Sequence, residues 1–262
     1  MACNNSLVTI VLPLYRPKGD WGKQLINRIR ELDLFLADLA NIQYIVVYDD
    51  VVDHRLIDAF ELIREDLKHV SFVTYGENRG KGYALREGVK LVQTPYTILL
   101  DIDFPYKKEN IAVLILLLLG NQYDMVVGKR SDTYFRQLPL KRKIISKALS
   151  LMNRLLLKLP LSDTQSGIKG FNERGKSVFL QTTIDRFLVD TEFLLRGTKQ
   201  GLKIKTMNIE LRSGVTFSNF GSSVILTELK NFFRLVLLCW GLKTAARYTP
   251  SYTAPETART LI

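Results

Sequence analysis

The stretch TILLDID, residues 97–103, decides how the rest of the chain is interpreted. Four residues typical of a β-strand run directly into two aspartates, Asp101 and Asp103, which are one residue apart. Side chains on a strand alternate between its two faces, so both carboxylates would point to the same side. Ligands of a parallel α/β sheet bind at the carboxyl ends of its strands, and two carboxylates there could hold a hard divalent cation. The alternative is that these aspartates cap the next helix.

The composition is that of a globular protein long enough for one α/β domain. The chain has 262 residues, of which 47% are hydrophobic and 24% are charged. Its two cysteines, Cys3 and Cys239, lack metal-ligand spacing, which argues against a disulfide framework and a zinc site. The net charge of +11 favours anionic partners. We do not expect nucleic acid among them, because the basic residues are not interleaved with aromatic ones.

Strands and helices alternate on both sides of residues 97–103. Apolar runs rich in β-branched residues predict strands at 7–12, 44–48, 70–75, 97–100, 124–128 and 204–211. Helical periodicity predicts helices at 21–39, 53–67, 83–92, 108–119, 138–159, 186–200 and 224–242. We expect Pro13 to end the first strand. The alternation predicts a doubly wound, mainly parallel α/β sheet with helices on both faces, whose strands end at one common edge.

Seven motifs occur in the order and spacing of a known family. They are Val-Leu-Pro-Leu-Tyr (11–15), Val-Val-Tyr-Asp-Asp (46–50), Asn-Arg-Gly-Lys-Gly-Tyr-Ala (78–84), Leu-Asp-Ile-Asp (100–103), Val-Val-Gly-Lys-Arg (126–130), Ser-Asp-Thr-Gln-Ser-Gly-Ile-Lys-Gly-Phe (162–171) and Asp-Thr-Glu (190–192). With these motifs the chain resembles glycosyltransferase family 2, which has the GT-A fold. It is most similar to the polyprenyl-phosphate glycosyltransferases, such as the dolichyl-phosphate glucose and mannose synthases.

The resemblance implies a donor site for a nucleoside-diphosphate sugar of the UDP-glucose or GDP-mannose type. The residues it places there are Pro13, Tyr15, Asp49, Asp50, Asn78, Gly80, Lys81, Asp101, Lys169 and Arg212. An aromatic ring and a carboxylate suit a nucleobase, which offers a π-face and imide N–H donors. We expect the turn at 77–82 to let phosphate approach its backbone. The alternatives are a helix cap at 49–50 and a plain tight turn at 77–82.

The resemblance also implies a divalent cation, Mg²⁺ or Mn²⁺, held by Asp101 and Asp103. Asp103 is the expected direct ligand, and Asp101 would contact the ribose, the metal or its ligands. A cation there would neutralise the leaving diphosphate. Two positions depart from the family pattern: Val51 and Val52 replace Gly-Ser, and Pro105 replaces a metal-binding glutamine of the mannose synthases.

The implied acceptor is a polyprenyl phosphate, with Arg130, Arg142 and Ser146 around its phosphate. A phosphate monoester has a second pKa of about 6 and is already an anion at neutral pH, so it needs cations more than a base. A sugar-hydroxyl acceptor, the first alternative, would need a general base. The candidates for that base are Asp163, Asp190 and Glu192. The second alternative is a non-catalytic subunit that only binds the nucleotide sugar.

The long helices predicted at 138–159 and 224–242 have apolar faces bordered by cations. Such helices suit a membrane interface, and the alternative is packing against the core or a partner. We expect a catalytic domain at 1–222, an amphipathic helix at 223–245 and a flexible tail at 246–262. The longest apolar run, 111–119, is shorter than the ~20 residues that span a bilayer. The expected location is therefore cytoplasmic, peripheral on the cytosolic membrane face, with a membrane-protein partner or a homo-oligomer left open.

Overall fold

The computed structural model describes residues 7–130, 157, 166–213, 215, 222–240 and 259–261. Except for residue 157, the helix predicted at 138–159 lies outside these residues, and so do the predicted site residues Arg142, Ser146 and Asp163.

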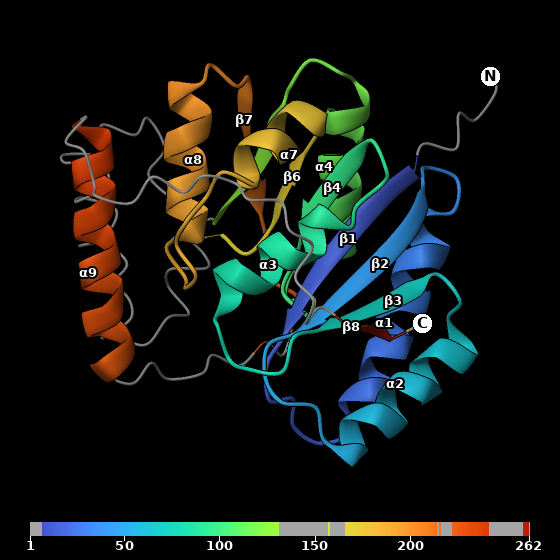
Figure 1. The fold of residues 1–262 in the computed structure, drawn as a ribbon. Helices are drawn as coiled ribbons and strands as arrows, with labels where there is room; N and C mark the ends of the chain where they lie inside the picture. The colour runs from blue at the N-terminus through green and yellow to red at the C-terminus, as the bar shows by residue number, and fades with distance from the viewer. Residues whose placement is uncertain are drawn as a thin grey trace.

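One mainly parallel sheet organises the described part of the chain (Figure 1). Its eight strands lie in the order β7-β5-β6-β4-β1-β2-β3-β8. Their bounds are β1 Leu7–Leu14, β2 Asn41–Tyr48, β3 Val70–Thr74, β4 Tyr96–Leu99, β5 Met125–Arg130, β6 Lys169–Phe171, β7 Ile204–Ile209 and β8 Arg259–Leu261. Strands β6 and β8 are antiparallel to their neighbours, and the other pairings are parallel. The sheet predicted from the sequence is therefore confirmed.

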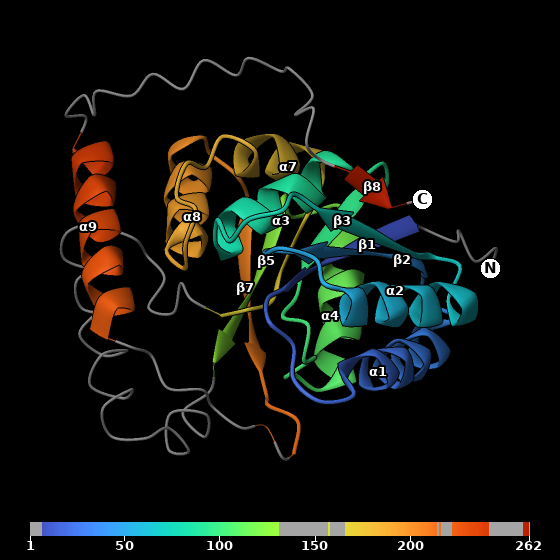
Figure 2. The same cartoon turned by 60° about the horizontal axis from the view of Figure 1, so that its bottom comes forward.

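Helices cover both faces of this sheet. The described helices are α1 Trp21–Leu36, α2 His54–Asp66, α3 Lys81–Lys90, α4 Lys108–Leu119, α7 Glu173–Phe179, α8 Val189–Lys199 and α9 Ser222–Cys239. Figure 2 shows α1, α2 and α4 beneath the sheet and α3, α7 and α8 above it, while α9 stands outside α8. Two buried clusters match this division, one on the α1 face and one on the α3 face. The doubly wound arrangement is confirmed as well.

Strand β4 lies at the centre of the sheet, between β1 and β6. Its residues Ile98 and Leu99 are buried, and the chain turns just beyond it, where the N–H of Phe104 donates to the carbonyl of Asp101 at 3.0 Å. Phe104 has a φ of +47°, a left-handed conformation that is costly for an aromatic residue. The central strand therefore delivers Asp101 and Asp103 to the middle of the carboxyl edge.

Strand β1 continues through Pro13 to Leu14, so the prediction that Pro13 ends it is wrong. Pro13 pairs in register with Val47 of β2, whereas the pairing of β1 with β4 stops at Val11. In a parallel strand, the backbone N–H and C=O groups of successive residues point alternately toward the two neighbouring strands. The carbonyls show the alternation: Leu14 accepts from Asp49 beside β2, and Val11 accepts from Leu100 beside β4. Proline has no backbone N–H. At position 13 that group would point toward β4, where the pairing of β1 has already ended, so the sheet loses no hydrogen bond.

Two short elements, β6 and α7, are not among the sequence predictions. Strand β6 has three residues, too few for a periodic signal, and it fits between β4 and β5 because Gly170 has no side chain. A Cβ at Gly170 would lie 2.4 Å from Leu114 Cδ2 of α4. Helix α3 begins at Lys81, two residues earlier than predicted.

Strand β8 lies within the segment 246–262 that the sequence predicts as a tail. It is antiparallel to β3, with Leu261 opposite Phe72 and Arg259 opposite Thr74. The division of the chain into a domain, a helix and a tail stays a prediction.

Candidate active site at the carboxyl edge of the sheet

The two acids after β4 have different surroundings. The ammonium Nζ of Lys81 lies 2.7 Å from Oδ1 of Asp101, and it comes from the first turn of α3. The other carboxylate oxygen faces Gly167, where an added Cβ would lie 1.9 Å from Oδ2. Asp103 is exposed. Partial loss of water around its carboxylate, followed by the negative charge of Asp101, raises the pKa of Asp103. A cation bound between the two carboxylates would relieve this repulsion, so cation binding there is favourable.

Charges of alternating sign continue inward from Asp101. Burial by itself would lower the pKa of Lys81, but the charges of Asp101 and then Asp190 outweigh it and raise that pKa. Asp190 is buried and pairs with Lys169, with 2.8 Å between Oδ1 and Nζ. Lys169 has no exposed area, and its ammonium also donates to the carbonyl of Ser166 at 2.5 Å. The predicted contact of Lys169 with the donor stays a prediction.

Tyr106 lies close to the same acids. It is buried, and its hydroxyl oxygen accepts a hydrogen bond from the N–H of Gly167 at 2.9 Å. Burial and then the charge of Asp101 raise the pKa of Tyr106, so the phenol stays protonated. Its hydroxyl holds Gly167 in place beside Asp101.

A second group forms where β1 and β2 end. Tyr15 is half exposed, and Cζ of Arg16 lies 5.1 Å from the centroid of its ring. Nε of Arg16 donates to Oδ2 of Asp50 at 2.7 Å, while Oδ1 of Asp50 accepts from the N–H of Val51 at 3.0 Å. The hydrogen bond from Arg16 lowers the pKa of Asp50. Arg16 has a φ of +40°, a strained conformation of the kind that clusters at functional sites. The predicted Tyr15 and Asp50 are thus brought together, and Pro13 precedes them in β1.

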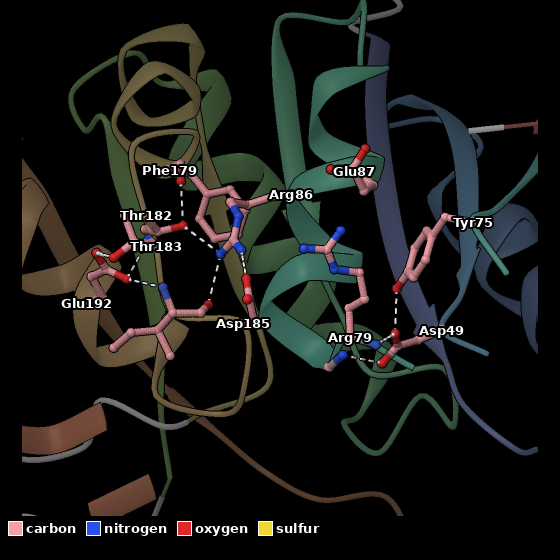
Figure 3. A network of polar contacts seen from close by, with 12 residues as sticks. Asp49, Tyr75, Arg79, Arg86, Glu87, Phe179, Thr182, Thr183, Asp185 and Glu192 are labelled. Atoms are coloured by element: carbon pink, nitrogen blue, oxygen red, sulfur yellow. Dashed lines mark hydrogen bonds and ion pairs between the residues drawn. The ribbon is translucent and has the colours of Figure 1, made fainter. Parts of the chain in front are cut away.

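Asp49 is buried, and Figure 3 shows its carboxylate between Tyr75 and the start of α3. Its carboxylate accepts from the hydroxyl of Tyr75 at 2.6 Å, from Nδ2 of Asn78 at 3.0 Å, and from the N–H groups of Arg79 and Gly80, both at 2.7 Å. Burial raises the pKa of Asp49, and these hydrogen bonds oppose the rise. The structure uses Asp49 to hold the glycine-rich turn, and its predicted contact with the donor stays a prediction.

The glycine-rich turn packs against the chain itself. The N–H groups of Gly82 and Tyr83 donate to the carbonyl of Asp185 at 2.8 and 3.3 Å. A Cβ at Gly82 would lie 2.2 Å from the carbonyl oxygen of Ile184, and one at Gly80 would lie 2.5 Å from that of Asp185. The expectation that phosphate approaches this backbone stays a prediction. The absence of side chains at the two glycines leaves room for the segment 182–188, and the N–H groups of Arg79, Gly80 and Gly82 already have acceptors.

Glu192 holds the same segment from the other side (Figure 3). Its carboxylate accepts from the N–H groups of Thr183 and Ile184, both at 2.8 Å, and from Nε of Arg196 at 2.7 Å. Its side chain is 1% exposed. The base role predicted for Glu192 stays a prediction, although its oxygens are already occupied.

Arg86 completes the anchoring of segment 182–188. It is buried on α3 and donates to the carbonyl of Ile184 at 2.8 Å, and it also pairs with the carboxylate of Asp185. Arg186 extends from this segment to Oδ1 of Asn78 at 3.0 Å. The turn that positions Lys81 is thus fixed from two directions.

Two more predicted residues lie at or near the carboxyl edge. Arg130 is the last residue of β5 and pairs in register with Ile209 of β7. Nη2 of Arg212 donates to the carbonyl of Asp103 at 3.3 Å, and its backbone N–H donates to that of Pro105 at 2.9 Å. Nε of Arg212 is buried without a hydrogen-bond partner in the part of the chain that the structure describes. A buried N–H of this kind is costly and suits a ligand oxygen.

Several residues of the site are absent from the sequence predictions. Arg16 adjoins Tyr15 in the sequence, and its position after the first strand was the available signal. Tyr75, Arg86 and Tyr106 act through contacts with residues far away in the chain, and no local pattern indicates such contacts.

The acids after β4 fit a divalent cation in ligand type. Asp101 and Asp103 supply hard oxygen ligands, and their repulsion favours a positive charge between them. Among the described residues, no group of three or more His, Cys, Asp or Glu side chains could hold a metal. Asp101 and Asp103 would supply two of the ligands of such a cation.

Solved structures share this fold. Glucosyl-3-phosphoglycerate synthase from Mycobacterium tuberculosis, crystallised with Mn²⁺, UDP-glucose and phosphoglyceric acid, superposes with a TM-score of 0.62 at 15% identity. The alignment covers 92% of this chain and 82% of that one. At this identity the likeness shows the fold alone, and the fold is that of the GT-A glycosyltransferases.

Sequence relatives indicate which kind of glycosyltransferase the chain resembles. The dolichyl-phosphate beta-glucosyltransferase of Dictyostelium discoideum is 23% identical over 257 residues, covering 92% of this chain and 78% of that protein. The UDP-N-acetylglucosamine–dolichyl-phosphate N-acetylglucosaminyltransferase of Methanococcus voltae is 25% identical over 175 residues, covering 64% and 69%. The family model "Glycosyl transferase family 2" matches residues 9–179. The chain belongs to glycosyltransferase family 2.

Proposed function

We propose that this family 2 glycosyltransferase moves a hexose from a nucleoside-diphosphate sugar to a polyprenyl phosphate, with inversion at the anomeric carbon and with the help of a divalent cation. One observation carries the proposal. Tyr15 and Asp50, an aromatic residue and an acid, lie at the same edge of the sheet as the two acids after β4. A nucleoside suits the first pair and a diphosphate suits the second.

The donor would lie across the carboxyl ends of β1, β2 and β4. Tyr15 offers a ring face to the base, and Asp50, held by Arg16, offers a fixed carboxylate for an imide N–H. Arg212 has a buried N–H to donate beside Asp103. A divalent cation, Mg²⁺ or Mn²⁺, bound by Asp103 and Asp101 would stabilise the negative charge that develops on the leaving diphosphate. The Mn²⁺ and UDP-glucose of the solved relative support this assignment.

A phosphate acceptor is favoured over a sugar hydroxyl by the state of Glu192. A hydroxyl needs a general base within reach, and the carboxylate of Glu192 is buried and fully engaged with segment 182–188 and Arg196. A phosphate needs only positioning by cations, for which Arg130, Arg142 and Ser146 are proposed. The names of the two relatives, both transferases that act on dolichyl phosphate, support the same acceptor class.

Helix α9 would rest on the membrane that carries such an acceptor. Phe232 and Leu235 face inward and pack with Leu195 of α8, whereas Leu229 and Phe233 are exposed. Trp240, which follows the last residue of the helix, is also exposed, and Lys230 and Arg234 lie on the outer surface. An apolar stripe bordered by cations suits the interface of an anionic membrane. We propose a peripheral protein on the cytosolic face.

No described helix combines the length and apolar character that crossing a bilayer requires.

The decisive experiment is a transfer assay with purified protein, a divalent cation, polyprenyl phosphate and a panel of nucleotide sugars. Release of nucleoside diphosphate and the mass of the lipid product are the readouts. The proposal predicts a hexosyl phospholipid with UDP-glucose or GDP-mannose, and Asp103→Asn should reduce its formation at least 100-fold. Binding of nucleotide without any transfer would instead favour a non-catalytic subunit.

The acceptor class is tested with two variants. Arg142→Ala should abolish transfer to polyprenyl phosphate, whereas Asp163→Asn should leave most of it. Loss of transfer only in Asp163→Asn or Glu192→Gln, together with activity on a glycan hydroxyl, would refute the phosphate acceptor. Because Glu192 also holds the segment 182–188, its variant needs a folding control by circular dichroism.

A further inference from the structure

A cation that belongs to the chain itself lies beside Asp101. Nζ of Lys81 lies 2.7 Å from Oδ1 of Asp101, and the side chains are 18% and 36% exposed. This pair is better shielded than a surface ion pair, so its attraction is screened less by water and salt. The helix that carries Lys81 is fixed by contacts of its own, which include the hydrogen bond from Gly82 to Asp185.

Asp101 has little freedom to avoid this lysine. Its Oδ2 faces the backbone of Gly167, where even a Cβ would lie 1.9 Å away. Gly167 is held in turn by the hydroxyl of Tyr106, at 2.9 Å. Both oxygens of Asp101 therefore have close neighbours, an ammonium on one side and a fixed backbone on the other.

The described charges around this pair balance. Three acids, Asp101, Asp103 and Asp190, stand near three cations, Lys81, Lys169 and Arg212. A divalent cation alone would leave two uncompensated positive charges there, whereas a cation that arrives with a diphosphate would leave the net charge unchanged. Coulomb energy in a partly buried site therefore favours joint binding.

We propose that Lys81 is a resident competitor for the cation site: in the donor-free chain its ammonium occupies Asp101 and weakens binding of a free divalent cation. This inference rests on the proposed function, since it concerns the same cation site. It assigns Lys81 as a positioning residue that makes cation binding depend on the donor diphosphate, which would give the ammonium another anionic partner.

The test measures Mn²⁺ binding to the donor-free protein by the electron paramagnetic resonance signal of free Mn²⁺. Lys81→Met removes the ammonium but keeps a long apolar side chain, and it should bind Mn²⁺ about tenfold more tightly than the wild type or better. Lys90→Met is the matched control, because Lys90 is on the same helix but pairs with Glu87. The control should bind Mn²⁺ as the wild type does.

A double variant shows whether the tighter Mn²⁺ binding occurs at the acids after β4. Adding Asp103→Asn to Lys81→Met should abolish the tighter binding, and tight binding that survives this change would overturn the proposal. Equal or weaker Mn²⁺ binding in Lys81→Met would overturn it too. If that protein does not fold, Lys81→Gln serves the same comparison. The measurement needs no glycosyl transfer, so a negative result here leaves the transfer assay, and the proposed function, to be judged separately.

Discussion

The backbone N–H of Gly82 donates a hydrogen bond to the carbonyl oxygen of Asp185, with 2.8 Å between nitrogen and oxygen. The start of α3 thus receives an acceptor from a segment that lies far along the sequence. Because Lys81 is adjacent to Gly82, the same contact sets the position of the ammonium beside Asp101. Folding of the segment 182–188 onto α3 is therefore part of forming the site.

Gly82→Ala should destabilise the protein. Its Cβ would lie 2.2 Å from the carbonyl oxygen of Ile184 and 2.9 Å from Cβ of Val189, and neither atom belongs to a flexible side-chain end. Overpacking of this kind costs about 1–3 kcal/mol, which urea denaturation would measure. Gly120→Ala is the control, because its nearest atom would be 3.6 Å away and its φ suits alanine. Equal effects of the two changes would contradict the packing described here.

Asp49→Asn should loosen the glycine-rich turn. An amide nitrogen would replace one of the two oxygens that accept from Tyr75, Arg79 and Gly80, and a buried donor would then face another donor. The expected loss is about 1–3 kcal/mol of unfolding free energy. Asp53→Asn serves as control, since Asp53 caps α2 through the N–H of Leu56 and asparagine caps equally well. A stable Asp49→Asn protein would show that the turn does not depend on this carboxylate.

Arg16→Ala should weaken the donor site without changing the chemistry. Asp50 would lose the hydrogen bond that fixes its carboxylate, and Tyr15 would lose the guanidinium beside its ring. We expect KM for the nucleotide sugar to rise about tenfold with kcat nearly unchanged, the pattern of lost uniform binding. Arg28→Ala on α1, whose partner is Glu31, should leave both constants alone. A fall in kcat at constant KM would place Arg16 at the reacting groups instead.

Glu228→Gln should remove a pH dependence of stability. Burial raises the pKa of Glu228, and the N–H groups of Phe187 and Leu188, which donate to its carboxylate, oppose the rise. The folded protein therefore takes up this proton at a higher pH than the unfolded chain does. Acidification through the window just above 4.5, the ordinary value, adds stability through Glu228.

The comparison is made by urea denaturation at pH 7 and pH 5. The free energy of unfolding of Glu228→Gln should exceed that of the wild type by most at pH 7, where the wild type holds a buried charge. This difference should shrink toward pH 5. Glu173→Gln on α7 is the control, because that side chain is 63% exposed. A constant difference between wild type and Glu228→Gln across this range would show that Glu228 does not titrate with folding.

Much of the fold could be predicted because the hydrophobic pattern repeats with the period of each element. The strands before residue 130 and the helices between them occur within a few residues of their predicted bounds. Strand β6 could not be predicted, since three residues carry no period and its place between β4 and β5 depends on the absence of a side chain at Gly170.

The sequence by itself determined the class of fold and the family. It also determined that Tyr15, Asp50, Asp101 and Asp103 lie at one edge of the sheet. These follow from local rules, because parallel strands that alternate with helices must all end on the same side. The tertiary structure decided which groups remain available there. Asp49 and Glu192 hold backbone N–H groups, and Lys81 holds Asp101. Such pairings depend on distances between segments that are remote in the chain, and no local pattern specifies those distances.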